Sequence, residues 1–234
     1  MPVKKYTAEV IENTKITKDV YTLKLKLDGD IEFLPGQFIN IILPKDGKMV
    51  QKSYSIVSLS SQKDFLELCI KKIEGGYFST YLHNVQAGDK FEIMGPFGLF
   101  IPKHEDDQSD AIFVATGTGI SAIKPIIEYF LENKTKKQLY LIFGVRFEED
   151  VYYRELFESL AKKHHNFHFI PTLSKPSHHW KGEKGYVQEW FKKHVKFNNQ
   201  DVYICGLVPM CEELEKLCKE KGFSREKIHL EKYL

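Results

Sequence analysis

A short glycine-rich segment is the clearest candidate for chemistry in this sequence. Residues 115–122 read Ala-Thr-Gly-Thr-Gly-Ile-Ser-Ala, after an apolar run and before an amphipathic stretch. Glycines at this spacing allow a tight turn whose backbone N–H groups approach a diphosphate, and the N-terminus of a following helix adds partial positive charge. A glycine turn that only packs helix against strand is the alternative, but the strand–turn–helix context favours dinucleotide binding. The predicted nucleotide-binding residues are Thr116, Gly117, Thr118 and Gly119.

The next strand of the same region lacks an acidic residue at its end. It runs Phe143-Gly-Val-Arg146, whereas the common dehydrogenase fingerprint places an Asp or Glu there to bind the ribose. The sequence therefore does not predict the common dehydrogenase variant of this turn.

A second candidate lies in the first half of the chain. Residues 51–55 read Gln-Lys-Ser-Tyr-Ser in a strand-like stretch, and residues 75–80 read Gly-Gly-Tyr-Phe-Ser-Thr before a helical segment. A tyrosine followed by a hydroxyl can stack on a flavin and hydrogen-bond to its ring nitrogen. Taken alone, the first segment is better explained as an ordinary strand tyrosine between solvated serines.

The elements that carry these segments change character along the chain. Up to about residue 100, short alternating runs such as Val20–Leu27 and Phe65–Lys71 are separated by glycine-rich turns, which predicts a small antiparallel β-barrel. After an acidic, apolar-poor stretch at residues 101–110, strand-like runs alternate with helical stretches. That alternation predicts an α/β domain with a five-stranded parallel sheet, whose ligands bind at the carboxyl ends of the strands. We therefore predict two domains, residues 1–102 and 108–234.

Composition excludes several other classes of protein. Of 234 residues, 42% are hydrophobic and 28% charged, which allows a sizeable core and a solvated surface. Lys and Arg number 34 against 32 Asp and Glu, so the basic excess of a nucleic-acid-binding protein is missing. The four cysteines fit neither a disulfide framework nor a metal or iron–sulfur spacing, and we predict no metal site. The sequence shows no apolar run long enough to span a membrane, and we expect a cytoplasmic protein.

Taken together, six motifs resemble those of the ferredoxin–NADP reductase superfamily of flavin and pyridine-nucleotide oxidoreductases. The resemblance covers nearly the full length, and the motifs occur in the family order. They are Lys52-Ser-Tyr-Ser55, Gly75-Gly-Tyr-Phe-Ser79, Gly88-Asp89 with Gly95-Pro-Phe-Gly98, Thr116-Gly-Thr-Gly119, Gly144-Val-Arg146 with Asp150, Tyr153 and Glu155-Leu156, and Cys205-Gly-Leu-Val-Pro-Met210.

For the barrel, the resemblance implies FAD binding, with FMN as an open alternative. Tyr54 would stack against the isoalloxazine and Ser55 would hydrogen-bond near N5, so both count as candidate catalytic residues. Lys52 stands where the family usually has an arginine on the flavin phosphates, and a lysine offers a point charge without a bidentate fork. Ser53, Gly75, Gly76 and Ser79 complete the predicted flavin-binding set.

For the α/β domain, the resemblance implies nicotinamide binding. Cys205, the third candidate catalytic residue, would lie beside the nicotinamide C4, although a buried structural thiol is its alternative. Tyr233, in the tail Glu231-Lys-Tyr-Leu234, resembles the terminal aromatic that covers the flavin in plant-type members. The other predicted cofactor-binding residues are Arg146, Ser174, Lys175, Gly206 and Met210.

The coenzyme is NADH or NADPH, and two segments indicate opposite choices. Thr172-Leu-Ser-Lys175 places a hydroxyl and a cation where NADP users often bind the 2′-phosphate. Residues 180–187, Trp-Lys-Gly-Glu-Lys-Gly-Tyr-Val, resemble a stretch of NADH-using relatives. We favour NADH.

The resemblance implies hydride transfer from the nicotinamide to the flavin, followed by electron release to a separate acceptor protein. A ferredoxin, a flavodoxin or an oxygenase or iron–sulfur partner would serve, since the sequence shows no fused iron–sulfur or haem domain. Three alternatives stay open: a flavin-free NAD dehydrogenase, a flavin-bearing electron-transfer subunit of a larger complex, and a non-catalytic nucleotide-binding module.

Overall fold

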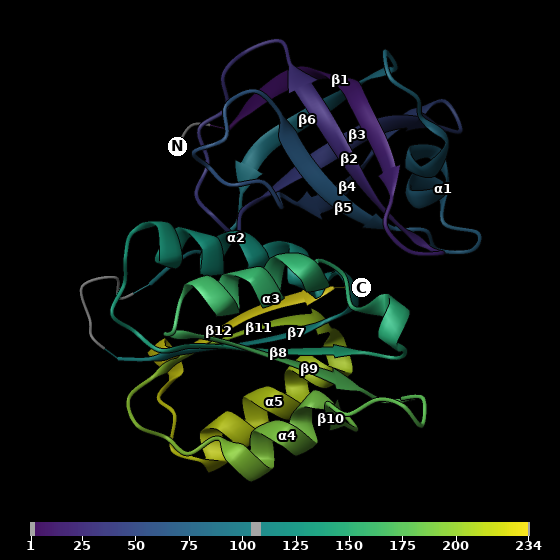
Figure 1. Cartoon of the computed structure of the whole chain (residues 1–234). Helices are drawn as coiled ribbons and strands as arrows, with labels where there is room; N and C mark the ends of the chain where they lie inside the picture. Colours follow the sequence, from purple (N-terminus) through teal and green to yellow (C-terminus); the bar gives the residue numbers. More distant parts are fainter. Residues whose placement is uncertain (1–2, 104–108, 234) are drawn as a thin grey trace. The chain divides into compact units, whose positions relative to one another are not determined.

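The computed structural model describes residues 3–103 and 109–233. The chain forms two compact units, Met1–Pro102 with Lys124–Tyr129, and Lys103–Ile123 with Phe130–Leu234. The acidic stretch expected to link two domains includes residues 104–108, which lie outside the described residues. Each unit is built around its own sheet (Figure 1).

The first unit is an antiparallel sheet of six strands with one helix. Its order is β4-β3-β6-β1-β2-β5, so strands distant in sequence are neighbours. In β2, Leu23 and Leu25 are fully buried while Lys26 is exposed, as the period-two pattern predicted. The elements are β1 (Lys4–Lys15), β2 (Val20–Leu27), β3 (Phe38–Lys45), β4 (Lys48–Ser55), β5 (Leu66–Lys71), α1 (Tyr77–Asn84) and β6 (Lys90–Phe97).

The sheet curls because its two edge strands approach each other. Ile56, directly after β4, forms an antiparallel bridge with Leu68 of β5. The N–H of Val57 donates to the carbonyl of Glu67 at 2.8 Å. The enclosed core includes Leu23, Ile41 and Ile93, with the partly buried Tyr54 packed against it. The predicted barrel is confirmed.

The position of α1 is fixed at both of its ends. At the C-terminal end, the Asn13 side-chain amide donates to the carbonyls of Leu82, His83 and Val85 at 3.1, 3.3 and 2.9 Å. At the N-terminal end, the Ser79 hydroxyl accepts from the N–H of Ile73 at 3.0 Å. The N-terminus of α1 is therefore held at a defined place beside the barrel strands.

The second unit is a parallel sheet with helices on both faces (Figure 1). Its order is β10-β9-β8-β7-β11-β12, and α2 and α3 cover one face while α4 and α5 cover the other. Five strands were predicted; the sixth is the two-residue β10, which pairs with the end of β9. The elements are β7 (Ala111–Thr116), α2 (Ile120–Glu132), β8 (Leu139–Val145), α3 (Arg154–Lys163), β9 (Phe167–Leu173), β10 (Glu183–Lys184), α4 (Val187–His194), β11 (Asp201–Leu207), α5 (Val208–Glu220) and β12 (Ile228–Tyr233).

The strand order reverses between β7 and β11. Both strands are apolar along their length, with Ile112 to Ala115 and Val202 to Cys205 buried, because helices cover both faces of the sheet. A ligand site is expected in the crevice at the carboxyl ends of these two strands. The glycine turn at Gly117–Gly119 and the Cys205-Gly206 pair both lie there.

Candidate functional site

The flavin motif lies on β4, an edge strand paired only with β3 in the sheet. Side chains two residues apart share a face of a strand, so Lys52 and Tyr54 point the same way. Tyr54 is half-buried against the barrel core, and this burial raises the pKa of its phenol, which stays neutral. Lys52 is exposed. The strand thus presents an aromatic ring and an exposed lysine along one face.

The serines of the same motif are placed differently. The Ser53 hydroxyl donates to Asn40 Oδ1 at 2.8 Å, on the face of β4 opposite to Tyr54. Ser55 ends the strand and is 7% exposed. The structure therefore uses the Ser53 side chain to hold β4 to β3, and a cofactor contact by its hydroxyl stays a prediction.

The turn before α1 has the form expected of an anion-binding site. Gly75 adopts a φ of +71°, and an added Cβ would meet nothing within 4 Å. At Gly76, the N-cap, a Cβ would lie 2.7 Å from the Ser79 hydroxyl and 3.0 Å from the Ile73 carbonyl. Gly76 therefore has no room for a side chain, whereas Gly75 is favoured by its positive φ. The Ser79 hydroxyl closes this turn. The first backbone N–H groups of a helix have no partner within the helix, so those at the start of α1 could donate to an anion.

These features fit a flavin nucleotide. The isoalloxazine ring would stack on the face of Tyr54. The phosphates would bind at the open turn at Gly75 and at the N-terminus of α1. Lys52 would supply a positive charge without a planar fork.

The glycine turn of the second unit is constrained by a neighbouring strand. A Cβ on Gly119 would lie 2.2 Å from the carbonyl oxygen of Cys205 and 2.9 Å from the backbone nitrogen of Gly206. Gly117 differs, because it has a φ of +52° and faces open space. Gly119 thus allows the turn to pack on β11, while Gly117 gives the turn its shape and leaves room above it.

The glycine turn also brings three further predicted residues together, Thr116, Gly206 and Met210. A Cβ on Gly206 would lie 2.2 Å from Thr116 Oγ1 and 2.6 Å from the Met210 methyl group. Thr116 Oγ1 is buried, and it has no hydrogen-bond partner among the residues that the structure describes. Four predicted residues, Thr116, Gly119, Gly206 and Met210, are therefore brought together where the strand order reverses. An unpartnered hydroxyl and an open turn fit a bound nucleotide.

Cys205 and Tyr233 also lie together. Cys205 is fully buried, and burial followed by the nearby Glu231 carboxylate raises the pKa of its thiol well above the ordinary value. The Tyr233 hydroxyl donates a hydrogen bond to this sulfur, which works in the opposite direction. β11 and β12 pair Cys205 with Glu231 and Leu207 with Tyr233, so the contact follows from the register. The thiol is neutral, and its contact with Tyr233 lies within the second unit.

Arg146, Ser174 and Lys175 are adjacent at the ends of β8 and β9. The N–H of Ser174 donates to the Val145 carbonyl at 3.0 Å, and that of Lys175 to the Arg146 carbonyl at 2.9 Å. The Arg146 and Lys175 side chains are exposed. Two cations therefore lie at the carboxyl edge of the sheet, Arg146 one strand away from the glycine turn and Lys175 two strands away.

Trp180 organises the loop between β9 and α4. Its indole N–H donates to the Glu183 carbonyl at 2.8 Å, and its ring occupies the space beside Gly182, where a Cβ would lie 2.6 Å away. The Arg154 guanidinium lies 5.5 Å from the centre of the ring. The Trp–Gly pattern therefore has a structural cause, whichever coenzyme binds.

The sequence reasoning missed Tyr186 as a candidate. Gly185 forms two hydrogen bonds with the last two residues of β9. Its N–H donates to the Leu173 carbonyl, and its carbonyl accepts from the Thr172 hydroxyl. Tyr186 follows directly and is 63% exposed. An exposed aromatic that directly follows the residue bonded to the end of β9 offers a stacking surface for a base. The signal was present in residues 180–187, which we interpreted only as a whole.

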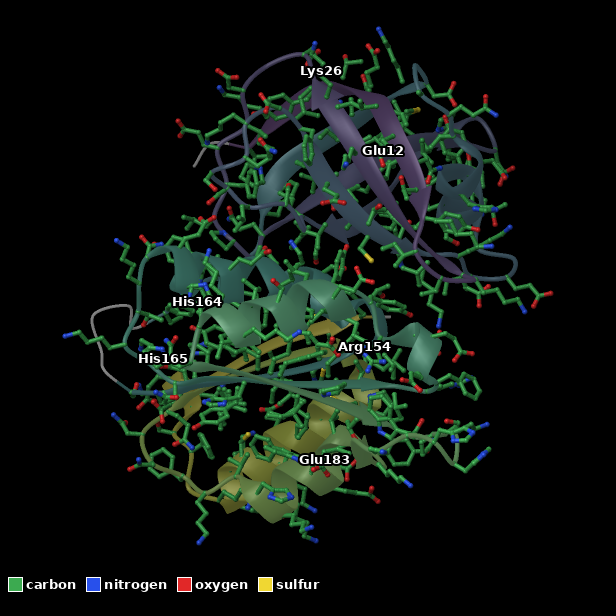
Figure 2. All side chains as sticks on the ribbon, in the orientation of Figure 1. Glu12, Lys26, Arg154, His164, His165 and Glu183 are labelled. Carbon is green, nitrogen blue, oxygen red and sulfur yellow. The ribbon has the colours of Figure 1, made fainter. Side chains whose placement is uncertain are left out.

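No metal centre is found in the described residues. His164 and His165 follow α3 (Figure 2), and the described part of the chain holds no group of three or more His, Cys, Asp or Glu side chains placed to bind a metal ion. Within residues 3–103 and 109–233, none of the helices has the length and apolar character needed to cross a membrane.

The fold and these two sites define a class of protein, one with a flavin-binding barrel and a nucleotide-binding α/β unit. Residues 7–101 match the family described as Oxidoreductase FAD-binding domain. Residues 113–216 match the Oxidoreductase NAD-binding domain. The chain belongs to the ferredoxin–NADP reductase superfamily.

Individual relatives are similar over most of this chain. The ferredoxin–NADP reductase B of Sorangium cellulosum is 34% identical over 209 residues, 86% of this chain and 85% of the relative. The phenol hydroxylase P5 protein of Acinetobacter pittii is 36% identical over 239 residues, 99% of this chain but 66% of the relative. The crystal structure of the Amycolatopsis cytochrome P450 reductase GcoB has a TM-score of 0.92 at 28% identity, covering 99% of this chain and 70% of that one. The chain thus spans about two thirds of the length of two of these relatives.

Proposed function

We propose that this chain is an NAD(P)H-dependent flavoprotein oxidoreductase that passes a hydride from NAD(P)H to FAD and then electrons to a separate acceptor. The similarity to a ferredoxin–NADP reductase, to a phenol hydroxylase component and to a cytochrome P450 reductase supports this class of reaction. The acceptor would be a ferredoxin, a flavodoxin, or an oxygenase or iron–sulfur partner. We place the protein in the cytoplasm and the domain boundaries at residues 1–102 and 108–234.

The observation that carries the proposal is the packing at the switch point of the parallel sheet. Gly119 and Gly206 have no room for a side chain, because the Cys205 backbone and the Thr116 hydroxyl occupy that space. This arrangement keeps the turn before α2 close to β11 and leaves the Thr116 hydroxyl without a partner among the described residues. Backbone N–H groups and the helix N-terminus then face one point, which suits a diphosphate.

The residues of the barrel would bind and orient the flavin. Tyr54 supplies a neutral, half-buried ring whose position is fixed by the core. Ser55 is placed by the end of β4, and its hydroxyl would matter most as the ring nitrogen receives the hydride. Positioning two reactants in this way can lower a barrier by about 7–11 kcal/mol in favourable cases. The proposal requires no acid–base pair or nucleophile from the chain.

For coenzyme choice, we propose NADH. The proposal rests on residues 180–187, which resemble a stretch of NADH-using relatives. The exposed Lys175 and Arg146 are the side chains that a 2′-phosphate would contact if NADPH were the coenzyme. Tyr186 would contact the adenine of either coenzyme.

The test is an absorption spectrum of the purified protein, recorded anaerobically before and after addition of NADH. We expect a flavin band in the blue that bleaches within the mixing time. A colourless protein that still oxidises a substrate with NAD would indicate a flavin-free dehydrogenase. A flavin band that neither NADH nor NADPH bleaches would indicate an electron-transfer subunit. Nucleotide binding without flavin or turnover would indicate a non-catalytic module.

A further inference from the structure

Ser121 is a buried polar residue that nothing in the described structure satisfies. It lies in the first turn of α2, a helix of 13 residues, directly after the glycine turn. The residue is 1% exposed, and its hydroxyl has no hydrogen-bond partner among the residues that the structure describes.

Other buried serines of this chain do have partners. Ser58 is 4% exposed, and its hydroxyl accepts from the N–H of Glu67 at 3.0 Å. Ser79 is 7% exposed and accepts from the N–H of Ile73 at 3.0 Å. A buried hydroxyl without a partner lowers stability, so alanine would be the better residue at position 121 if folding alone mattered. We therefore expect the Ser121 hydroxyl to form its hydrogen bond with a bound ligand.

The direction of the Ser121 side chain indicates where that partner lies. Side chains of an α-helix tilt toward its N-terminus, so Ser121 leans toward the turn formed by Gly117–Gly119. The space around Gly117 is open, since an added Cβ would meet nothing within 4 Å. Thr116 Oγ1, on the strand side of the same turn, is the other unpartnered buried hydroxyl there. Two hydroxyls with unused hydrogen-bonding capacity thus flank the turn.

We propose that the Ser121 hydroxyl donates a hydrogen bond to the diphosphate of the bound nicotinamide nucleotide. The inference rests on the proposed function, because it assumes that this turn binds the coenzyme. A diphosphate is the favoured partner, since it accepts hydrogen bonds only and is negatively charged at a helix N-terminus. The oxygen is closed off from solvent in this structure, so the proposal requires the glycine turn to shift when the nucleotide binds, and the Gly117 side of the turn has open space.

The test compares Ser121→Ala with the wild-type flavoprotein in two measurements. The first is thermal unfolding without added nucleotide, where we expect the variant to be as stable as the wild type or more stable. The second is titration calorimetry with ADP and with AMP. We expect ADP binding to weaken about tenfold and AMP binding to stay nearly the same, since only ADP has the diphosphate.

Ser58→Ala is the matched control, because its buried hydroxyl has a partner within the protein. It should lower the unfolding temperature and leave ADP binding unchanged, the opposite of Ser121→Ala. A loss of stability in Ser121→Ala, unchanged ADP binding, or an equal loss for ADP and AMP would each overturn the inference. If the wild-type protein binds neither ADP nor NADH, the proposed function is wrong, and the inference about Ser121 is wrong as well.

Discussion

At the scale of single residues, Tyr54 connects the barrel core to the proposed flavin site. Its ring packs against the core from an edge strand, so one side of the residue is fixed by folding. The motif alone could be explained as an ordinary strand tyrosine, and the sequence could not decide this because burial on one face looks the same in both cases.

We predict that Tyr54→Ala lowers flavin content, because the loss of stacking costs about 1 kcal/mol beyond the lost burial. Tyr54→Phe keeps the ring and should retain flavin. The ratio of flavin to protein absorbance after gel filtration measures both. Full occupancy in Tyr54→Ala would show that the ring does not stack on the flavin.

Substitution of Lys175 tests whether the protein prefers NADH or NADPH. A contact between its ammonium group and a 2′-phosphate would contribute roughly 1.5–3 kcal/mol, or about ten- to a hundredfold in kcat/KM for NADPH. We expect instead that wild-type protein favours NADH and that Lys175→Ala changes kcat/KM for both coenzymes little, because residues 180–187 resemble a stretch of NADH-using relatives. Lys216→Ala, on an exposed part of α5, is the control. A wild-type preference for NADPH of about tenfold or more would contradict this.

Glu231 gives a pH-dependent prediction. Burial raises the pKa of its carboxyl, so the folded protein disfavours the charged form. Below the ordinary carboxyl pKa, Glu231 is neutral in both the folded and the unfolded protein and does not affect the free energy of unfolding. As the pH rises from the ordinary pKa to the raised one, the free energy of unfolding decreases, and above the raised pKa the loss is constant. Glu231→Gln should therefore raise the unfolding temperature at about pH 8 and have little effect at about pH 4. If the wild type is more stable than Glu231→Gln at about pH 8, the charged carboxylate stabilises the folded protein, and the prediction is wrong.

At the scale of elements, strong periodicity predicted structure well. The alternating run at Val20–Leu27 is β2, and the apolar run before the glycine turn is β7, Ala111–Thr116. β1 was not predicted, because only Tyr6, Ala8 and Val10 are buried among its 12 residues, and the rest are polar or charged except for the exposed Ile11. The two-residue β10 has no sequence pattern of its own and exists through its pairing with β9.

The site was predictable as a set of motifs but not as a set of contacts. The sequence placed Cys205 and Tyr233 in the same site through a resemblance, whereas the hydrogen bond between them depends on the register of β11 with β12. Likewise, Ser79 was expected to bind phosphate and is found closing the turn before α1. Such pairings depend on neighbours that are distant in the chain, so local spacing does not reveal them.

Gly119 tests the packing of the glycine turn. A Cβ there would lie 2.2 Å from the Cys205 carbonyl, so Gly119→Ala must displace the turn from β11. We expect nucleotide binding to be lost while the barrel keeps its flavin, measured by calorimetry and flavin absorbance. Gly117→Ala has free space and should cost only about 1–2 kcal/mol for its positive φ. Equal effects of the two variants would contradict the packing argument.

At the scale of the whole molecule, the two units divide the proposed work. The barrel offers a ring-binding strand and a phosphate turn, and the α/β unit offers the nucleotide turn at its switch point. Chemistry that is carried by cofactors asks little of the chain beyond such binding surfaces. This explains why the pattern of glycines, rather than a triad of reactive side chains, was the informative feature of the sequence.

Net charge leads to a prediction about the acceptor. With 34 Lys and Arg against 32 Asp and Glu, the formal charge is +2, so the molecule as a whole has no strong field to steer a charged partner. Reduction of ferricyanide, an anion, and of cytochrome c, a basic protein, by the NADH-loaded enzyme should therefore change less than about threefold between roughly 20 and 300 mM salt. Stopped-flow rates at several ionic strengths measure this for both acceptors. A steep fall with salt for one acceptor and not for the other would show that a local charged surface, rather than the net charge, governs its encounter with the protein.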